Sequence, residues 1–214
     1  MYIKNHLMLK DKLTTVSLDE TLKSAIEKIK AGNFLSLPVL SEDGKNFEGI
    51  LMKEAIYRKF YEWESMPRGD FLTKTKVRDI FTDNYKSVHD DDYIEKASFM
   101  LRSFNTPFLP VFNSEEKFVG IVTHDAIFDA FFKLFGFGKG ERILVRISDE
   151  PGQLAKLTDI FEKESVNIAS LLVYNPGILN IQQVILTVET DDLPKIMDKL
   201  GRKGFMATRL DNRE

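Results

Sequence analysis

Few residues in this chain combine into a pattern that could do chemistry. The three histidines, His6, His89 and His124, show no H-x-x-x-H spacing of a metal site. The absence of cysteine excludes disulfides, thiolate metal ligands and a cysteine nucleophile. The acidic run Asp90–Asp92 stands at an expected helix start, where the helix dipole explains it better than a metal does. No G-x-S-x-G, P-loop or Rossmann glycine pattern occurs. We therefore expect no enzyme, no metal and no cofactor.

Composition indicates a globular, soluble protein. Hydrophobic residues make up 43% of the 214 residues and charged residues 29%. The formal net charge is −3 with both signs interspersed, so the basic footprint of a nucleic-acid-binding protein is missing. The first residues, MYIKNHLMLKDK, are too polar for a secretory signal, and no run approaches the roughly 18 apolar residues of a membrane span. We expect a cytoplasmic protein without nucleic-acid or membrane partners.

One segment of the chain occurs twice. LPVL at Leu37–Leu40 recurs as LPVF at Leu109–Phe112, an offset of 72 (109 − 37). GILMKEAIYRKF at 49–60 recurs as GIVTHDAIFDAF at 120–131, an offset of 71 (120 − 49), because the preceding loop is one residue longer in the first copy. Each copy predicts a β-α-β-β-α order, so the repeat marks two duplicated domains.

Cap residues and composition shifts set the expected boundaries. Asp19 and Asp91 are placed as helix N-caps, and Gly32 fits a helix end. The polar stretch 64–76, with Pro and Gly, is typical of a connection between copies, and the glycine-rich stretch 136–140 of a flexible joint. The expected domains are residues 1–63, 77–135 and 141–212.

The third domain has a different pattern. Arg142–Ile147 alternates like a strand, and the turn Asp149–Gly152 follows, with Pro151 suited to the first helical turn. A helix, two strands, a second helix over 191–204 and a last strand complete a β-α-β-β-α-β order, which is ferredoxin-like. The whole chain is thus expected to be of the α+β class.

The duplicated half resembles a known family. Its β-α-β-β-α order, LPV strand and G-I-h-T strand end (h apolar) resemble a tandem pair of cystathionine-β-synthase-type (CBS) domains over residues 1 to about 135. The resemblance implies two clefts between the copies that hold adenine nucleotides. The implied contact residues of copy one are Lys12, Thr15, Val16, Asn33, Phe34, Leu35, Ser36 and Pro38. Those of copy two are Lys86, Ser87, Val88, Thr106, Pro107, Phe108, Pro110, Thr123 and His124. Core packing is the alternative role of the Leu, Val and Pro positions.

The third domain is similar to the ACT family of regulatory domains, on its D-x-P-G-x-L motif and later N-I. The resemblance implies side-by-side pairing and a small effector, often an amino acid, at the first strand-to-helix turn. The implied residues are Asp149, Gly152, Gln153, Leu154, Asn167 and Ile168. The glycine lets a ligand approach the backbone, and a helix N-terminus offers N–H groups to a carboxylate. Alternatively, Gly152 only shapes the turn. The layout of a CBS pair followed by an ACT domain resembles that of small bacterial proteins associated with acetoin utilisation.

Two alanines narrow the choice of nucleotide that the clefts could bind. In CBS proteins that bind AMP or ATP, the strand end reads G-x-x-T-x-x-D, with the Thr on phosphate and the Asp on the ribose hydroxyls. Counting from Gly120, Thr123 is present but Ala126 replaces the Asp, and in copy one Met52 and Ala55 stand at the two positions. Cyclic di-AMP lacks a free vicinal diol, so alanine is favoured over a carboxylate near its phosphate. CBS proteins that sense cyclic di-AMP also lack this Asp.

Three possibilities for the two clefts stay open. They bind cyclic di-AMP, which we favour; or they bind AMP or ATP without the carboxylate; or they bind no ligand and only hold the fold together.

Phenylalanines at 128, 131, 132 and 135 form one helix face, suited to core and subunit contact. The sequence therefore predicts a non-enzymatic homodimeric sensor that relays nucleotide binding to the ACT dimer or to a partner enzyme. A ligand-free assembly scaffold is the alternative, and a regulator of acetoin or amino-acid metabolism that binds AMP or ATP is another.

Overall fold

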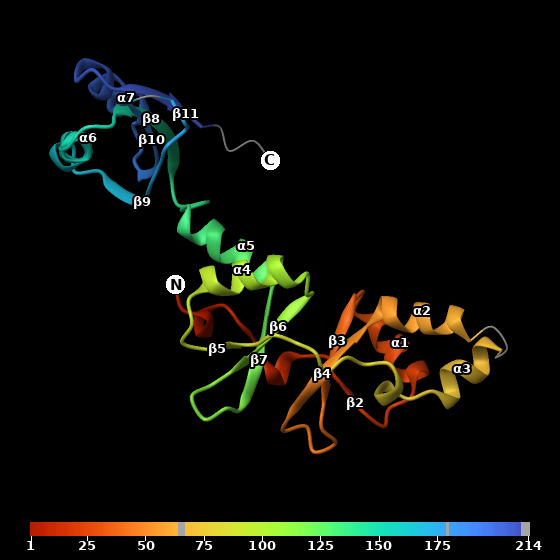
Figure 1. The fold of residues 1–214 in the computed structure, drawn as a ribbon. Helices are drawn as coiled ribbons and strands as arrows, with labels where there is room; N and C mark the ends of the chain where they lie inside the picture. The colour runs from red at the N-terminus through yellow and green to blue at the C-terminus, as the bar shows by residue number, and fades with distance from the viewer. Residues whose placement is uncertain (64–66, 179, 211–214) are drawn as a thin grey trace. The chain divides into compact units, whose positions relative to one another are not determined.

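The computed structural model describes residues 1–63, 67–178 and 180–210. The chain forms two compact units, Met1–Phe128 and Asp129–Glu214. Figure 1 shows the mixed helices and strands of both, which confirms the α+β class. The start of the predicted connection (64–66) and the end of the predicted third domain (211–212) lie outside the described residues. Within the described ranges, no helix has the length and apolar character needed to cross a bilayer.

The two copies have the same architecture, and the boundary between the two units falls within the last helix of copy two. Copy one consists of β2 (Val16–Ser17), α1 (Leu22–Ala31), β3 (Ser36–Leu40), β4 (Phe47–Met52) and α2 (Lys53–Glu62). Copy two consists of β5 (Val88–His89), α4 (Ile94–Phe104), β6 (Phe108–Phe112), β7 (Phe118–Thr123) and α5 (His124–Leu134). In each copy the first strand runs parallel to the second, and the second runs antiparallel to the third. The predicted β-α-β-β-α order is confirmed.

Equivalent residues share backbone details. Asn33 and Asn105 follow the first helix of their copies and both adopt left-handed backbone, with φ of 51° and 47°. Asparagine tolerates this conformation better than most residues because its side chain bonds locally. The register shifts at Val39/Leu40 in one copy and at Val111/Phe112 in the other. The duplication therefore extends to turns and bulges that the sequence alone did not reveal.

The segment before each copy packs on the other copy. At the N-terminus, the short helix η1 (Ile3–Asn5) and strand β1 (Met8–Leu9) precede η2 (Lys10–Lys12), and β1 pairs with β7. The backbone N–H of Ile3 donates to the carbonyl of Asp92 in copy two. Between the copies, the short helix η3 (Val77–Asp79) bonds in the same way to the start of α1, with the Val77 N–H on the Glu20 carbonyl. The first residues of the expected domain 1–63 thus lie on copy two.

These crossing segments explain the glycine that opens the repeated motif. A Cβ on Gly49 would lie 2.2 Å from the carbonyl oxygen of Thr82, and a Cβ on Gly120 would lie 2.2 Å from that of Met8. Both contacts are too short for any side chain, so each glycine is required by a close backbone approach.

The connection between the copies contains a helix that the sequence analysis did not predict. α3 spans Arg68–Lys74, and its Phe71 is fully buried in the core of copy one. Phe71 packs near the rings of Phe60 and Trp63. Phe71 and the half-buried Leu72 are the apolar residues of this helix, and two adjacent residues are too few to produce a helical hydrophobic pattern.

An apolar core joins the two copies. Its buried members come from β3, β4, β6 and β7: Leu40, Phe47, Ile50, Phe108, Phe118 and Ile121. Phe47 is central, with its ring edge-on to Tyr85 at 4.8 Å and 5.0 Å from that of Phe118. Such aromatic pairs stabilise by roughly 0.5–1.5 kcal/mol beyond their burial. The pair of copies therefore behaves as one packed module.

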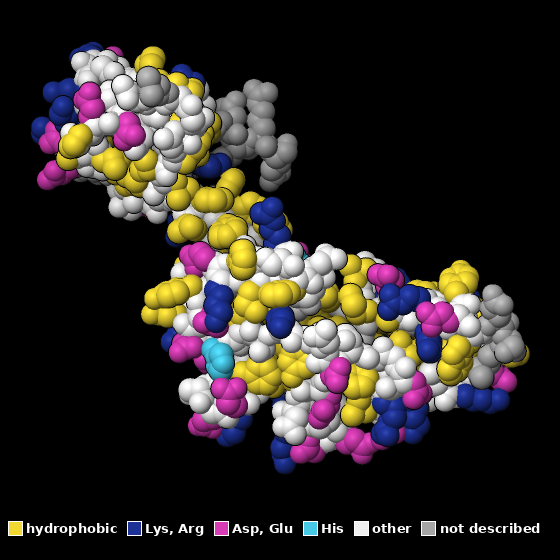
Figure 2. Space-filling model, in the orientation of Figure 1, with side chains coloured by type: hydrophobic (Ala, Val, Ile, Leu, Met, Phe, Trp, Pro, Cys, Tyr) yellow, Lys and Arg dark blue, Asp and Glu magenta, His cyan; other side chains and the backbone are white. Residues whose placement is uncertain are grey.

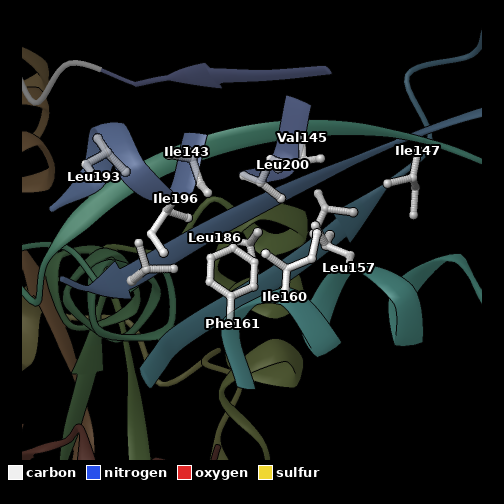
Figure 3. Packing of buried hydrophobic residues seen from close by; sticks show 12 residues of the cluster. Ile143, Val145, Ile147, Leu157, Ile160, Phe161, Leu186, Leu193, Ile196 and Leu200 are labelled. Atoms are coloured by element: carbon white, nitrogen blue, oxygen red, sulfur yellow. The ribbon is translucent and has the colours of Figure 1, made fainter. Parts of the chain in front are cut away.

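The second unit has the predicted ferredoxin-like order. It consists of β8 (Glu141–Ser148), α6 (Gln153–Lys163), β9 (Asn167–Tyr174), β10 (Ile181–Glu189), α7 (Leu193–Arg202) and β11 (Met206–Arg209). The antiparallel sheet has the order β11-β8-β10-β9. Ile143, Val145 and Ile147 alternate along β8, which places them on one sheet face against Leu157 and Phe161 of α6 (Figure 3).

The end of α5 is bonded to this sheet. The Ser170 hydroxyl donates to the carbonyl of Leu134 at 2.8 Å, and the Thr187 hydroxyl to that of Phe135 at 3.0 Å. Helix C-termini leave their last carbonyls without intrahelical donors, and these two hydroxyls supply them. Gly136, with φ of 67°, fits tightly against both side chains. The joint that the sequence analysis treated as flexible is therefore attached to the second unit at its first glycine.

Three of the predicted helix-terminal residues have other roles. Thr21, not Asp19, caps α1 by accepting from the Ser24 N–H, while Asp19 pairs with Lys76. α4 follows Tyr93 without a side-chain cap, so Asp91 is not its N-cap. Pro151 lies before α6, whose N-cap is Gly152. These predictions were wrong because each helix begins two residues later than expected. Gly32 is the C-cap of α1, as predicted.

Candidate functional site

In copy one, the predicted turn lies against the start of α2. Ser36 on β3 pairs with Met52 at the end of β4. The carbonyl of Leu35 accepts from the N–H of Lys53 at 2.9 Å, and the Phe34 N–H donates to Ile29. Leu35 itself is 74% exposed. This arrangement joins the turn, the strand end and the first turn of α2 in one place.

Copy two repeats the arrangement with more polar groups. Phe108 on β6 pairs with Thr123 at the end of β7. The Thr106 hydroxyl donates to the carbonyl of Phe108 at 2.8 Å. Nε2 of His124 lies 3.2 Å from the carbonyl oxygen of Thr106. Four of the residues predicted for this cleft thus stand together.

Burial separates the predicted contact residues into two groups. Those buried in the strands are Val16, Pro38, Val88, Phe108 and Pro110. Those exposed at the surface are Lys12, Asn33, Phe34, Leu35, Lys86, Ser87 and His124. Thr15, Ser36, Thr106, Pro107 and Thr123 are half-buried. The buried group packs the core, so only the side chains of the half-buried and exposed residues are accessible from the surface.

A lysine that the sequence analysis missed distinguishes the two copies. Lys28 donates from Nζ to the carbonyl of Thr15 at 2.9 Å and pairs with Glu20. The residue at the equivalent position of copy two (28 + 72 = 100) is Met100, which has no ammonium group. The carbonyl of Ser87, equivalent to that of Thr15, therefore lacks such a donor. No motif announces Lys28, and only the comparison of the two copies could have drawn attention to it.

The two alanines lie in the first turn of their helices. The hydroxyl of Thr123 accepts from the backbone N–H of Ala126 at 3.2 Å. One residue earlier, both copies carry an exposed acid, Glu54 in α2 and Asp125 in α5. One residue on a helix is a rotation of about 100°, so these carboxylates point away from the alanine position.

Within the acidic run Asp90–Asp92, the side chain of Asp92 has a structural role. The Asp92 carboxylate accepts from the His89 N–H at 2.8 Å and from Lys96 Nζ at 2.7 Å. Partial burial raises the pKa of Asp92, but these donors outweigh it and leave the pKa below its ordinary value. Across the described residues, no group of three or more His, Asp or Glu side chains is arranged to hold a metal.

The predicted effector residues of the second unit fall at two ends of its sheet. Asp149, at the first strand-to-helix turn, accepts from Gln182 at 2.5 Å. Asn167 donates to Glu189 at 2.8 Å. Gln182 and Glu189 are seven residues apart on β10, roughly 23 Å at the rise of a strand. Gly152, Gln153 and Leu154 lie with Asp149, and Ile168 lies with Asn167. One domain does not bring the six residues together.

Comparison with known proteins identifies both units. A family model for the CBS domain matches residues 3–62 and 77–133, and one for the ACT domain matches residues 142–205. A homoserine O-acetyltransferase of Methanosarcina acetivorans is 31% identical over 133 residues, which are 60% of this chain and 23% of that protein. A CBS domain-containing protein of Dictyostelium discoideum is 29% identical over 126 residues, 57% of this chain and 86% of that protein. The chain thus spans about a quarter of the acetyltransferase.

Solved structures share the fold of the CBS pair. A conserved hypothetical protein of Geobacillus kaustophilus has a TM-score of 0.55 at 24% identity, over 62% of this chain and 97% of that one. CBSX2 in complex with AMP has a TM-score of 0.52 at 20% identity, over 61% and 96%. The CBS domain of a bacterial CNNM/CorC family Mg²⁺ transporter in complex with ATP has a TM-score of 0.51 at 13% identity, over 60% and 85%. The repeated β-α-β-β-α units and the matching models agree, and the chain belongs to the CBS-domain family, as a tandem CBS pair followed by an ACT domain.

Proposed function

We propose that this protein is a non-enzymatic sensor whose CBS pair binds an adenine nucleotide, with cyclic di-AMP favoured. The observation that carries the proposal is the pair Ala55 and Ala126. Both stand where a ribose-binding carboxylate would be, at the helix start that meets the predicted cleft. The adenine-nucleotide class is supported by the shared fold of CBSX2, solved with AMP, and of the transporter domain, solved with ATP.

The alanines favour a ligand without free vicinal hydroxyls. In AMP and ATP both ribose hydroxyls are free, and a carboxylate accepting from them forms strong charge-assisted hydrogen bonds. In cyclic di-AMP the 3′-oxygen belongs to a phosphodiester, so a carboxylate at that position would face a negative charge. Glu54 and Asp125 are rotated away from this place, which leaves it uncharged in both copies.

The cleft of copy two is the better candidate. It retains the Thr123 hydroxyl, which can donate its proton to a phosphate while it accepts from Ala126. Its Ser87 carbonyl lacks the lysine contact that the Thr15 carbonyl has in copy one. In copy one Met52 replaces the threonine and offers no hydroxyl. We therefore expect tighter binding in the second cleft, with Lys12, Leu35 and Ser36 available for a ligand in the first.

The sensor is proposed to be a homodimer. Tyr57 and Tyr61 on α2 are equivalent to Phe128 and Phe132 on α5, and all four aromatic side chains are partly or largely exposed. In Figure 2 hydrophobic side chains lie at the surface over α5. Because both copies carry the same exposed pair, one module offers two like faces to a second module. Exposed apolar patches of this kind mark interaction sites.

Pairing of ACT domains would also complete an effector site. β9 is an edge strand of its sheet. If two copies of β9 pair antiparallel, Asn167 of one domain lies at the end of the sheet where its neighbour carries Asp149 and Gly152. The separation of these residues on one domain thus fits a site shared by two, for which an amino acid is the proposed ligand.

The nucleotide signal is proposed to pass through α5 to the ACT dimer or to a partner enzyme. α5 begins beside Thr123, in the predicted cleft of copy two. At its other end, the carbonyls of Leu134 and Phe135 accept hydrogen bonds from the hydroxyls of Ser170 and Thr187. A ligand shifts the equilibrium between two arrangements of the CBS copies only as far as it binds one arrangement more tightly than the other. Typical coupling free energies between two sites are about 1–3 kcal/mol. Regulation of acetoin or amino-acid metabolism is the context that the domain layout favours.

Thermal unfolding with separate additions of cyclic di-AMP, AMP, ADP and ATP tests the proposal. A ligand present at 100 times its dissociation constant adds about 2.7 kcal/mol of stability, a shift of several degrees. We expect the largest shift with cyclic di-AMP. A larger shift with AMP or ATP would show that the preferred ligand is one of those nucleotides and not cyclic di-AMP. No shift with any of them would leave a ligand-free scaffold, a role that the buried positions of Phe108 and Pro110 favour.

A further inference from the structure

The ACT domain carries a groove that is separate from the nucleotide site and shares only Gln153 with the predicted effector residues. It has a volume of about 720 Å³, within the range of roughly 300–1,000 Å³ typical of small-molecule sites. It lies where the end of β8, the first turns of α6 and the turn before β11 meet. In the sheet order β11-β8-β10-β9, β11 is the edge opposite β9, so pairing through β9 would not involve β11.

Three cations surround the groove without a carboxylate partner. Arg146 of β8, Lys156 of α6 and Lys203 of the turn before β11 are all exposed and all line it. Arg146 alternates with the buried Val145 and Ile147, so it lies on the sheet face opposite α6, and the cations line the groove from both sides of the sheet edge. Within the described ranges, none of the three forms an ion pair, whereas five of the nine lysines and arginines of residues 141–210 do. The one acid in the lining, Asp159, is already paired with Lys163 at 2.6 Å. The groove is therefore a place of unbalanced positive charge.

The rest of the lining is apolar or hydrogen-bonding. Ile147, Ile181, Phe205 and Met206 supply apolar surface, and Ser148 supplies a hydroxyl. β11 begins opposite Arg146, so the backbone of β8 beyond that residue has no strand beside it on this edge.

We propose that this groove binds a small organic anion with at least two negative charges and an apolar part. The three cations would hold the anionic group by charge-assisted hydrogen bonds, and the apolar residues would cover the remainder. The ligand is thus a second input, bound in a different domain from the nucleotide module. This inference does not depend on which nucleotide the CBS pair binds.

Isothermal titration with three probes tests the inference. Phenyl phosphate carries both the dianion and an apolar ring, inorganic phosphate carries the charge alone, and benzyl alcohol the ring alone. We expect phenyl phosphate to bind the full chain more tightly than inorganic phosphate, and benzyl alcohol not to bind measurably. The same titration is made with Arg146→Gln combined with Lys203→Gln, and with Lys139→Gln as a control. Lys139 is an exposed lysine of the same unit that lies outside the groove lining.

Loss of one hydrogen-bonded charge typically weakens binding by about tenfold, so the double variant should bind phenyl phosphate about 100-fold more weakly. The control should bind as the unaltered chain does, and circular dichroism should show that all three proteins are equally folded. The inference is overturned if phenyl phosphate does not bind at several millimolar. It is also overturned if the double variant and the Lys139→Gln control bind it equally.

Discussion

The hydroxyl of Thr123 accepts a hydrogen bond from the backbone N–H of Ala126, at 3.2 Å. The residue proposed to contact phosphate therefore also satisfies one of the free N–H groups at the start of α5. In copy one the equivalent residue, Met52, makes no such side-chain bond at the start of α2. The Thr123 side chain thus has a structural role as a helix cap and a proposed role in phosphate binding. Substitutions can test the two roles separately.

Thr123→Val should lower the free energy of unfolding by about 1 kcal/mol, the usual cost of losing a helix cap. It should also weaken nucleotide binding, because valine has no hydroxyl for phosphate. Urea denaturation gives the first effect and calorimetric titration with cyclic di-AMP the second. Thr123→Ser keeps the hydroxyl and should retain both properties. Full binding by a Thr123→Val protein would remove Thr123 from the nucleotide site.

Ala126→Asp should change the nucleotide preference. The new carboxylate could accept from the two free ribose hydroxyls of AMP, a gain of about tenfold in affinity for one charge-assisted hydrogen bond. It should weaken cyclic di-AMP binding by charge repulsion. Titrations of both ligands measure the ratio of the two affinities. Ser103→Asp adds the same charge at an exposed site on α4 and should leave the ratio unchanged. An unchanged ratio in Ala126→Asp would refute the argument from the alanines.

The fold could be predicted from the repeat, but the pairing of side chains could not be predicted from the sequence. An offset of 72 residues located both LPV strands, and the structure places them in equivalent sheets. Asp19 does not cap α1, because the helix begins two residues later, and its carboxylate instead binds Lys76, 57 residues away in the chain, a partner that no local pattern contains. The contact of Lys28 with Thr15 depends in the same way on tertiary packing. Sequence spacing reports which residues share an element, and it does not report which groups meet across elements.

Alanine at either repeat glycine should destabilise the CBS module. In Gly49→Ala or Gly120→Ala the new methyl carbon would lie 2.2 Å from a backbone carbonyl oxygen, so a crossing segment must move. Overpacking of this kind costs about 3 kcal/mol, at the upper end of its usual range. Gly69→Ala is the matched control, because a Cβ there meets no atom within 4 Å and lies in helix α3. Equal urea midpoints for all three variants would contradict the crossing arrangement.

Asp43 should titrate at unusually low pH. The Ser41 hydroxyl and the Lys45 N–H donate to its carboxylate and lower its pKa from 3.8 to about 2. Because the folded pKa lies below the unfolded one, this turn is stabilised above pH 3.8, and the contribution is lost as the pH falls toward 2. Carboxyl ¹³C NMR measures the pKa directly. Ser41→Ala removes the first donor and should raise the pKa toward its ordinary value. A pKa near 3.8 in the unaltered protein would show that the turn does not hold these hydrogen bonds in solution.

The exposed aromatic pairs should control dimer formation. Tyr61 on α2 is 76% exposed and Phe132 on α5 is 51% exposed, at equivalent positions of the two copies. We expect the unaltered chain to sediment at twice its monomer mass in analytical ultracentrifugation. Tyr61→Glu combined with Phe132→Glu places a charge in each of the two proposed faces, where burial without a partner is costly, and should shift the equilibrium toward monomer, with pairing through β9 as the remaining contact. Phe99→Glu is the control, since Phe99 is 69% exposed on α4 and belongs to neither face. If the Phe99→Glu protein dissociates and the double variant does not, the dimer forms through α4 instead of through α2 and α5.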